Sequence, residues 1–410
     1  MAGEPPGAGR GGYDPGTVST PHPPDPPCSP AAAAEVDRRA GLVERNLAEL
    51  LTRDELHALL ASGGPVRHYI GYEISGRVHL GGGLVAMAKV RDFQRAGIAC
   101  TLFLADWHTW INDKLGGDRE RIRRVALGYF GEALKAGLLC VGGEPEAVRV
   151  VLASDLYRER ADDYWATVVE VAKNTSLARM QRSITIMGRR EGEQVDFAKL
   201  LYPAMQAADI FALGAHIAHA GIDQRKAHVV ARDVAPKMRL NPLRDAAGRA
   251  LKPIAAHHPL LTGLLKPDRW PVPPEQRAEV LAAMKMSKSK PGSAIFVHDP
   301  PDEIRRKVRG AFCPPGEVEL NPVLDYIDQL CFGLGDAELR VVPPPGRGAP
   351  VSFAAIEEVR AAYRSGALHP MDAKSALADH LIARLEPARR HFADPERAAA
   401  LAELEALTAA

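Results

Sequence analysis

The sequence predicts an α/β protein in which a doubly wound parallel sheet is followed by a smaller, mainly α-helical domain. Three apolar, strand-like runs, at residues 68–74, 98–108 and 147–155, alternate with helical patterns, and this alternation is typical of parallel sheets covered by helices. Beyond residue 300 the apolar spacing is mainly helical. A chain of 410 residues is long enough to fill the cores of two such domains.

The chain before the first strand divides into two parts. Residues 1–33 are rich in Pro and Gly and carry few bulky apolar side chains. They cannot bury enough surface to offset the entropy of ordering, so we expect a disordered tail. Residues 34–63 show helical periodicity that stops at Gly63.

After the first strand, the loop SGRVHLGGG leads into a helix that stops at Gly97, and a second helix separates the second and third strands. Further helical patterns cover residues 160–190 and 197–213, and a stretch at 236–274 with several prolines is irregular. The apolar run 294–297 has the character of a strand. We place the domain boundary near Asp299, where helical patterns take over.

Composition narrows the class of protein. The content of 46% hydrophobic and 25% charged residues is ordinary for a globular protein, and no apolar run is long enough to span a bilayer. The N-terminus lacks a signal-peptide pattern. The five cysteines contain no CxxC pair, which argues against a disulfide framework or a zinc site. We therefore expect a cytoplasmic globular protein with no membrane partner, and we assign no metal ligands.

Two loops carry features of anion-binding sites. SGRVHLGGG lies between a strand and a helix, where backbone amides and the helix dipole favour an anion, and His79 could donate to a phosphate there. A glycine-rich turn is the plain alternative. The motif lacks the GxGxxG spacing of dinucleotide sites. The second loop, Met284–Gly292, is either a solvated surface loop or a polyphosphate clamp; its lysines are Lys285, Lys288 and Lys290.

The helical pattern at 197–213 carries a polar face. Tyr202, Gln206 and Asp209 are spaced i, i+4 and i+7 among apolar residues, so they point in one direction. They predict either a specific small-molecule pocket or a structural hydrogen-bond network, because a buried carboxylate needs donors. Gln224 lies near the start of the next helix, and His108 is either a pocket residue or a packed core histidine.

Seven strings extend the pattern over the chain from about residue 34 to the last helix: YIGYEISGRVHLGG, LFLADWH, YPAMQAADI, GIDQRKAHVVAR, HHPLLTGL, KMSKS and LHPMDAKSAL. In content and order they resemble the tyrosyl-tRNA synthetases of the archaeal and eukaryotic-cytosolic type, which are class I aminoacyl-tRNA synthetases. The resemblance implies a Rossmann-like catalytic domain over 34–299, with acceptor-arm and dimer helices at about 120–190, and a helical anticodon-binding domain over 300–410.

The resemblance also implies an activity and its partners. L-tyrosine would react with ATP, carried as its Mg²⁺ complex, to give tyrosyl adenylate, and a homodimer would transfer the tyrosyl group to tRNA(Tyr). Catalysis would depend on His79, Lys285 and Lys288. The tyrosine site would comprise Tyr69 and Asp209 at the phenol hydroxyl, with Glu73, Tyr202, Gln206 and Gln224. The ATP site would comprise Gly71, His79, Gly81, Gly82, Lys285, Met286, Ser287, Lys288 and Ser289, and the anticodon would contact His369 and Asp372.

The sequence departs from the family pattern at three places. Gly82 stands where the signature usually ends in a second histidine, the stretch 266–283 is longer than usual, and Leu330 stands where relatives stack an aromatic residue on an anticodon base, with Phe332 nearby. Residues 301–410 are also acidic, with 13 Lys and Arg against 17 Asp and Glu. Positive charge is local instead, at Arg305, Arg306, Lys307 and Arg309, and at Lys173, Arg179, Arg182, Arg189 and Arg190.

Two alternative functions remain open. A tryptophanyl-tRNA synthetase shares the fold, but the pairing of Tyr69 with Asp209 suits a phenol better than an indole. A synthetase-like paralogue that binds RNA without charging it would fit the missing signature histidine and the acidic C-terminal region. The intact KMSKS loop and the polar face of the pocket helix disfavour that reading.

Overall fold

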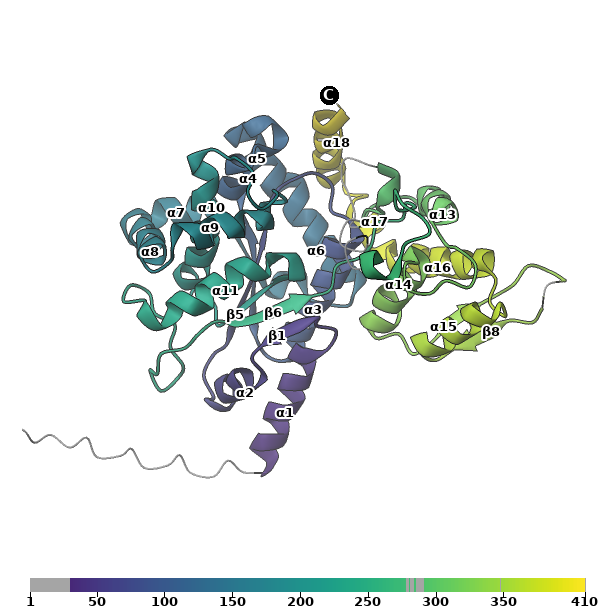
Figure 1. The fold of residues 1–410 in the computed structure, drawn as a ribbon, viewed down its shortest axis with the longest axis horizontal. Coiled ribbons are helices and arrows are strands. Elements are labelled where there is room, and N and C mark those ends of the chain that lie inside the picture. The colour runs from purple at the N-terminus through teal and green to yellow at the C-terminus, as the bar shows by residue number, and fades with distance from the viewer. Residues whose placement is uncertain (1–29, 278–279, 281–283, 285–290, 347, 410) are drawn as a thin grey trace, which may run out of the picture.

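The computed structural model describes residues 30–277, 280, 284, 291–346 and 348–409, and its core is a six-stranded sheet (Figure 1). The strand order is β1-β6-β5-β2-β3-β4, and all neighbours are parallel except β1 and β6. The strands are β1 (Glu49–Leu51), β2 (Arg67–Tyr72), β3 (Ala99–Leu104), β4 (Val148–Leu152), β5 (Ile217–Gly221) and β6 (Ile254–His258).

Side chains of the strands alternate between two hydrophobic cores, one on each face of the sheet. In β3, Leu102 and Leu104 enter the first core, whereas Phe103 between them enters the second. In β2, Ile70 enters the first core and Tyr69 enters the second. A parallel sheet buried on both faces is the arrangement that the apolar strands predicted, so the prediction of a doubly wound sheet is confirmed.

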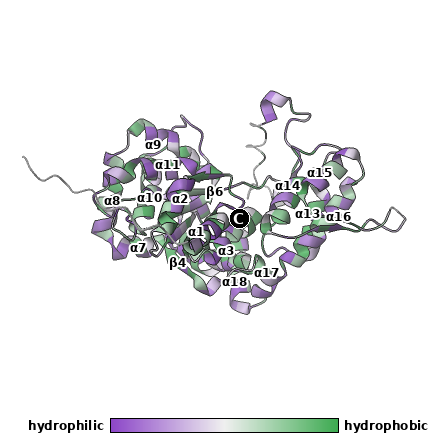
Figure 2. Ribbon diagram, turned by 90° about the horizontal axis from the view of Figure 1, so that it is seen from below, coloured by the Kyte–Doolittle hydropathy of each residue, from purple (hydrophilic) through white to green (hydrophobic). Residues whose placement is uncertain are grey.

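Helices cover both faces. The first core is built with α1 (Pro30–Glu44), α2 (Arg53–Ala61), α3 (Ala86–Arg95) and α6 (Gly131–Cys140), and the second with α7 (Ala153–Glu159), α8 (Ala161–Lys173), α9 (Leu177–Ser183), α10 (Phe197–Ala212) and α11 (Arg225–Val234). Buried α10 is mostly hydrophobic along its length (Figure 2). Connecting segments include α4 (Asp106–Ile111), α5 (Arg119–Val125) and two π-helical turns, η1 (Gly81–Val85) and η3 (Ala126–Phe130).

The C-terminal part is mainly helical, as predicted. It contains a small hairpin-like pair of strands, β7 (Leu339–Val341) and β8 (Val351–Phe353), and the helices α13 (Pro301–Gly310), α14 (Pro322–Leu330), α15 (Ile356–Ser365), α16 (Pro370–Arg384), α17 (Glu386–His391) and α18 (Pro395–Ala409). Its apolar side chains are continuous with the first core of the sheet domain. The end of the chain also returns to that domain, where His391 and Arg397 both bond Glu132 of α6, at 2.8 and 3.0 Å.

Several local predictions differ from the structure, and a long-range strand pairing explains the clearest case. The single helix expected at 34–63 is two helices separated by β1, which pairs with β6, and a Thr52–Glu55 capping box starts the second helix. Helix α1 begins at Pro30, four residues inside the predicted tail. The irregular stretch 236–274 contains β6, and the run 294–297 forms only one bridge, between Phe296 and His79.

The ends of two predicted strands also moved. The second strand stops at Leu104, so His108 lies in α4 rather than at a strand end, and the third stops at Leu152 before α7. The pattern at 160–190 is divided between α8 and α9. Within the described ranges, no helix combines the length and the apolar character needed to cross a membrane.

Candidate active site

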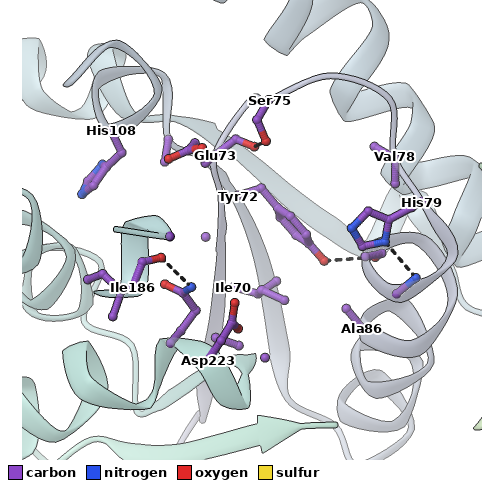
Figure 3. Close-up of a pocket in the computed structure, with 18 of the residues that line it drawn as sticks. Ile70, Tyr72, Glu73, Ser75, Val78, His79, Ala86, His108, Ile186 and Asp223 are labelled. Carbon is purple, nitrogen blue, oxygen red and sulfur yellow. Dashed lines mark hydrogen bonds between the residues drawn. The ribbon is translucent and has the colours of Figure 1, made fainter. Parts of the chain in front are cut away.

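A cavity of about 780 Å³ opens at the carboxyl ends of β2, β5 and β6 (Figure 3). Strand order reverses at β2, since β3 and β4 follow it on one side and β5 and β6 lie on the other. Open α/β sheets bind ligands at this switch point because the loops diverge there. His108 and Ile186 lie toward one end of the cavity, and His79 and Ala86 lie toward the other (Figure 3).

All six residues predicted for the tyrosine site line this one cavity. They come from four separate segments: β2, the loop after it, α10 and the turn η6 (Ile222–Gln224) that precedes α11. The helical spacing in α10 brings its three polar residues to the same side, as predicted. The six residues are Tyr69, Glu73, Tyr202, Gln206, Asp209 and Gln224.

Asp209 forms the buried end of the site. The hydroxyls of Tyr157 and Tyr164 both donate to its Oδ1, at 2.8 and 3.0 Å, and Nε2 of His108 lies 3.7 Å from Oδ2. Burial raises the pKa of Asp209 to about 8, against the lowering effect of the two hydroxyls. Burial, reinforced by the Asp209 charge, also raises the pKa of Tyr69 well above its usual value. A carboxyl group in this state can donate to a phenol oxygen or accept from its hydroxyl.

A second cluster of polar side chains surrounds Glu73. Nδ2 of Asn112 donates to its Oε2 at 2.7 Å, the hydroxyl of Tyr202 approaches the same oxygen at 3.4 Å, and Nζ of Lys114 lies 4.0 Å from Oε1. The carboxylate of Glu73 lines the cavity and brings negative charge to it. A cationic group of a ligand fits this position.

Two amides lie between these polar ends. Nε2 of Gln206 is 3.4 Å from Oε1 of Gln224, whose own Nε2 donates to the carbonyl of Ile186 at 3.0 Å. The backbone of the 184–187 turn therefore orients Gln224 and, through it, Gln206. Both amides are presented to the middle of the cavity.

The glycine-rich loop forms the other end. His79 accepts a hydrogen bond at Nδ1 from the amide of Gly81, at 3.1 Å, so a neutral imidazole there carries its proton on Nε2. His79 lines the cavity at this end. Gly71, Gly81 and Gly82 also line this end, and the Tyr72 hydroxyl donates to the Gly82 carbonyl at 3.2 Å (Figure 3).

Glycine is required at two positions of this region by close packing. A Cβ on Gly71 would lie 2.8 Å from the Tyr69 hydroxyl, and a Cβ on Gly83 would lie 2.2 Å from Cγ1 of Val297. Gly82 differs, because a Cβ there would meet the Tyr72 ring at 3.6 Å and Cγ1 of Val78 at 4.0 Å, which are ordinary contacts. The glycine in place of the usual signature histidine is therefore not imposed by the backbone.

Part of the predicted site lies outside the described residues. This applies to Lys285, Met286, Ser287, Lys288 and Ser289 of the KMSKS loop. The segment that follows the loop is described, and it is tied to the glycine-rich loop by backbone bonds from Leu80 to Ile295 (3.0 Å) and from Val297 to Val78 (3.1 Å). The glycine-rich loop is thus connected to the segment that follows the predicted KMSKS loop.

The residues predicted to contact an anticodon lie in the C-terminal domain, away from the cavity lining. His369 caps α16 by accepting from the amide of Met371 at 3.1 Å, and Asp372 lies in the first turn of the same helix. Leu330 is fully buried in the core, so it cannot stack on a base, whereas Phe332 is half-buried.

The basic cluster predicted on α13 is partly used inside the fold. Lys307 is buried and donates to buried Asp299 at 2.6 Å, so it cannot contact a phosphate. Arg305 and Arg306 each pair with a neighbouring carboxylate, and Arg179 pairs with a carboxylate on α11. The expectation of a freely available basic helix was wrong for Lys307, because an apolar helical face can bury a lysine that finds a carboxylate.

Sequence patterns missed several residues of the site. Tyr157 and Tyr164 come from helices whose spacing indicates only packing, and no local signal marks them as partners of Asp209. His258 at the end of β6 also lines the cavity; its Nδ1 lies 2.8 Å from Nε2 of His219, whose Nδ1 lies 3.2 Å from Nε2 of His68. Among the described residues, no group of His, Cys, Asp and Glu could hold a metal ion.

Comparison with known proteins identifies the family. The family model for class I tRNA synthetases (W and Y) matches residues 61–386. A tyrosine–tRNA ligase of Thermococcus sibiricus is 53% identical over 360 residues, which are 87% of this chain and 95% of that protein. The tyrosyl-tRNA synthetase of Pyrococcus horikoshii, solved with L-tyrosine, superposes with a TM-score of 0.86 at 50% identity, covering 90% of this chain and 99% of that one.

A tryptophanyl-tRNA synthetase from Aeropyrum pernix shares the fold at a TM-score of 0.62, but only 19% of its residues are identical over 92% of each chain. Similarity at that level reflects the fold alone. The family model matches most of this chain, and relatives that are about half identical over nearly their whole length are tyrosine-specific. The chain therefore belongs to the class I tRNA synthetases of the tryptophan and tyrosine family, on the branch of the tyrosine–tRNA ligases.

Proposed function

We propose that this protein activates L-tyrosine with ATP to form tyrosyl adenylate and then transfers the tyrosyl group to tRNA(Tyr). The observation that carries the proposal is the single cavity that joins a buried Asp209 at one end to the glycine-rich loop at the other. Along the cavity, the polar groups follow the same order as the groups of the substrates that they would bind: first the phenol of tyrosine, then its amino-acid end, and last the phosphates of ATP. The relatives named above support the same activity.

The phenol of tyrosine would enter the buried end. Its hydroxyl would bond Asp209 and the hydroxyl of Tyr69, while Tyr157 and Tyr164 hold Asp209 in place. The ammonium group would lie toward Glu73 and the hydroxyl of Tyr202, and the amides of Gln206 and Gln224 would fix the carboxylate end. These contacts orient one carboxylate oxygen toward ATP, which is the main contribution that an enzyme makes when no protein nucleophile takes part.

ATP would lie along the carboxyl ends of β2 and β5, with its phosphates near His79 and the backbone of Gly71, Gly81 and Gly82. Mg²⁺ would enter bound to the phosphates as part of the substrate. The tyrosine carboxylate attacks the α-phosphorus, the bond to the bridging oxygen of the β-phosphate breaks, and pyrophosphate leaves. The Nε2 proton of His79 and the ammonium groups of Lys285 and Lys288 would stabilise the charge that develops on the leaving phosphates.

In the second step a ribose hydroxyl at the 3′ end of tRNA attacks the tyrosyl carbonyl, and AMP leaves. The anticodon would contact the start of α16 at His369 and Asp372. Two exposed apolar side chains in the region of residues 120–190, Val169 and Leu177, support a homodimer formed through that region. We propose that the protein acts in the cytoplasm.

Tyrosine-dependent exchange of pyrophosphate into ATP, followed by charging of tRNA(Tyr), tests the proposal. We expect exchange with tyrosine and little with tryptophan or phenylalanine. Lys288→Ala should lower the rate of adenylate formation about 10²- to 10³-fold, as expected for one transition-state donor, with tyrosine affinity almost unchanged. Exchange that depends on tryptophan would favour the other branch of the family, and adenylate formation without charging would favour the RNA-binding paralogue.

A further inference from the structure

The last helix of the chain reaches the nucleotide end of the cavity. The family match stops at residue 386, so α18 lies wholly beyond it. Thr408, near the end of α18, nevertheless lines the cavity together with residues of the glycine-rich loop. In Figure 1, α18 runs along the sheet domain rather than with α13–α16.

Helix α18 contacts the sheet domain at several points. Leu404 is fully buried in the first core, and a Cβ on Gly128 of η3 would lie only 3.4 Å from the Cβ of Ala400. Glu403 pairs with Arg124 of α5 at 3.2 Å. The packing of Leu404 and Ala400 fixes the helix in register, and the carboxylate of Glu405 then lies beside the glycine-rich loop.

Glu405 pairs with Arg77, the third residue of the loop SGRVHLGGG, at 3.5 Å. The Arg77 guanidinium lies 4.1 Å above the ring of Phe296. Phe296 in turn forms the backbone bridge to His79. A chain of contacts thus runs from α18 through Arg77 and Phe296 to His79 and to the segment that follows the KMSKS loop.

We propose that α18 is a positioning element of the nucleotide site, in which Glu405 holds Arg77 on Phe296 and so sets the loop that carries His79. The inference rests on the proposed function, because it assigns α18 to the ATP end of that site. It assigns no role in tyrosine binding, since none of these contacts reaches Asp209 or Glu73. Glu405 and Arg77 are positioning residues and not catalytic ones.

The test compares Glu405→Lys with Glu403→Lys. Both place a lysine on the same helix, but the first repels Arg77 of the loop and the second repels Arg124 of α5. In pyrophosphate exchange at low ionic strength, Glu405→Lys should raise the KM for ATP about two- to five-fold, the range for one half-exposed ion pair. The KM for tyrosine should not change, and Glu403→Lys should match the wild type in both constants.

An unchanged or lower KM for ATP in Glu405→Lys overturns the proposal, as does a parallel loss of ATP and tyrosine binding, which would indicate a general loss of structure. If the wild type shows no tyrosine-dependent exchange, the proposed function is wrong, but the proposal about α18 is not yet tested. Equilibrium dialysis of Mg·ATP against the same two lysine variants then decides the role of α18.

Discussion

Asp209 is the residue on which amino-acid selectivity should depend. A buried site built to bond a hydroxyl leaves its own polar groups unpaired when phenylalanine enters, and that cost exceeds the loss of one neutral hydrogen bond. Asp209→Ala should therefore weaken tyrosine activation and narrow the ratio of kcat/KM for tyrosine over phenylalanine by orders of magnitude. Asp155→Ala, whose carboxylate pairs with Arg123, is the control. An unchanged ratio in Asp209→Ala would contradict the assignment of the phenol contact.

The titration of the same carboxyl group makes stability depend on pH. Its pKa is about 8 in the fold and about 3.9 in an unfolded chain. Between these values the native state binds a proton that the unfolded state does not, so this contribution to stability is complete below pH 4 and is lost as pH rises through 8. The free energy of unfolding of Asp209→Asn, relative to wild type, should rise by about 1.4 kcal/mol per unit from pH 5 to 8 and then level off. Urea titrations at four pH values measure it, and a constant difference would show that Asp209 is already ionised at pH 5.

Gly82 is a residue at which the site can be improved. Its position tolerates a Cβ, which would meet the Tyr72 ring at 3.6 Å, and it lies at the phosphate end of the cavity. Gly82→His adds a donor where the family signature usually has one. We expect the rate of adenylate formation to rise several-fold in stopped-flow measurements, with Gly82→Ala as the control for backbone effects. Equal rates in both variants would mean that the missing histidine costs this protein nothing.

At the scale of elements, the contact between α13 and the segment after the KMSKS loop depends on one buried ion pair. Lys307 and the Phe296 amide both donate to Oδ2 of Asp299, at 2.6 and 2.9 Å. Lys307→Met leaves a buried carboxylate without its cation, and such a loss typically costs about 3–5 kcal/mol. Adding Asp299→Asn should recover part of that loss, as measured by thermal or urea unfolding. Arg306→Met, at an exposed pair, should change stability by less than about 1 kcal/mol. An equal loss of stability in Lys307→Met and Arg306→Met would contradict the importance of the buried ion pair.

Local patterns predicted those elements whose character is set by their own residues. The strands β2, β3 and β4 and the helix α10 were recognised because their apolar spacing is clear. β1 was missed because it is defined by pairing with β6, over a separation of about 200 residues in the chain, and β6 itself lies between β1 and β5. The same limit applies to the site: the face of α10 was predictable from helical spacing, but the tyrosines that hold Asp209 arrive from α7 and α8 through tertiary packing.

At the scale of the whole molecule, both lobes share one continuous core, and α17 and α18 fasten the C-terminal part to the sheet domain. The predicted boundary near Asp299 therefore marks a change of architecture rather than a gap in packing. The sequence cannot indicate that the core is shared. The apolar faces of α14 and α16 would have the same residue pattern if they packed on a separate core. Motions of the C-terminal domain should accordingly be small unless a ligand replaces these contacts.

Buried histidines should make the molecule sensitive to acid. Burial lowers the pKa of five of them to about 3, against about 6.5 in an unfolded chain; they are His68, His108, His228, His258 and His298. Their contribution to stability is complete above pH 6.5 and is lost as pH falls toward 3, because only the unfolded state then takes up their protons.

Each histidine that stays neutral in the fold costs up to about 1.4 kcal/mol per pH unit below 6.5, so several of them together give a slope on the order of a few kcal/mol per unit. This outweighs the opposite slope of Asp209, and stability should be greatest near pH 6.5–7. Urea unfolding at pH 7.5, 6.5 and 5.5 should show a steep fall over the last interval. His68→Gln should lessen that slope, whereas His369→Gln, at the exposed start of α16, should have a smaller effect. Equal stability at pH 6.5 and 5.5 would mean that the buried imidazoles gain protons, or water, without unfolding the chain.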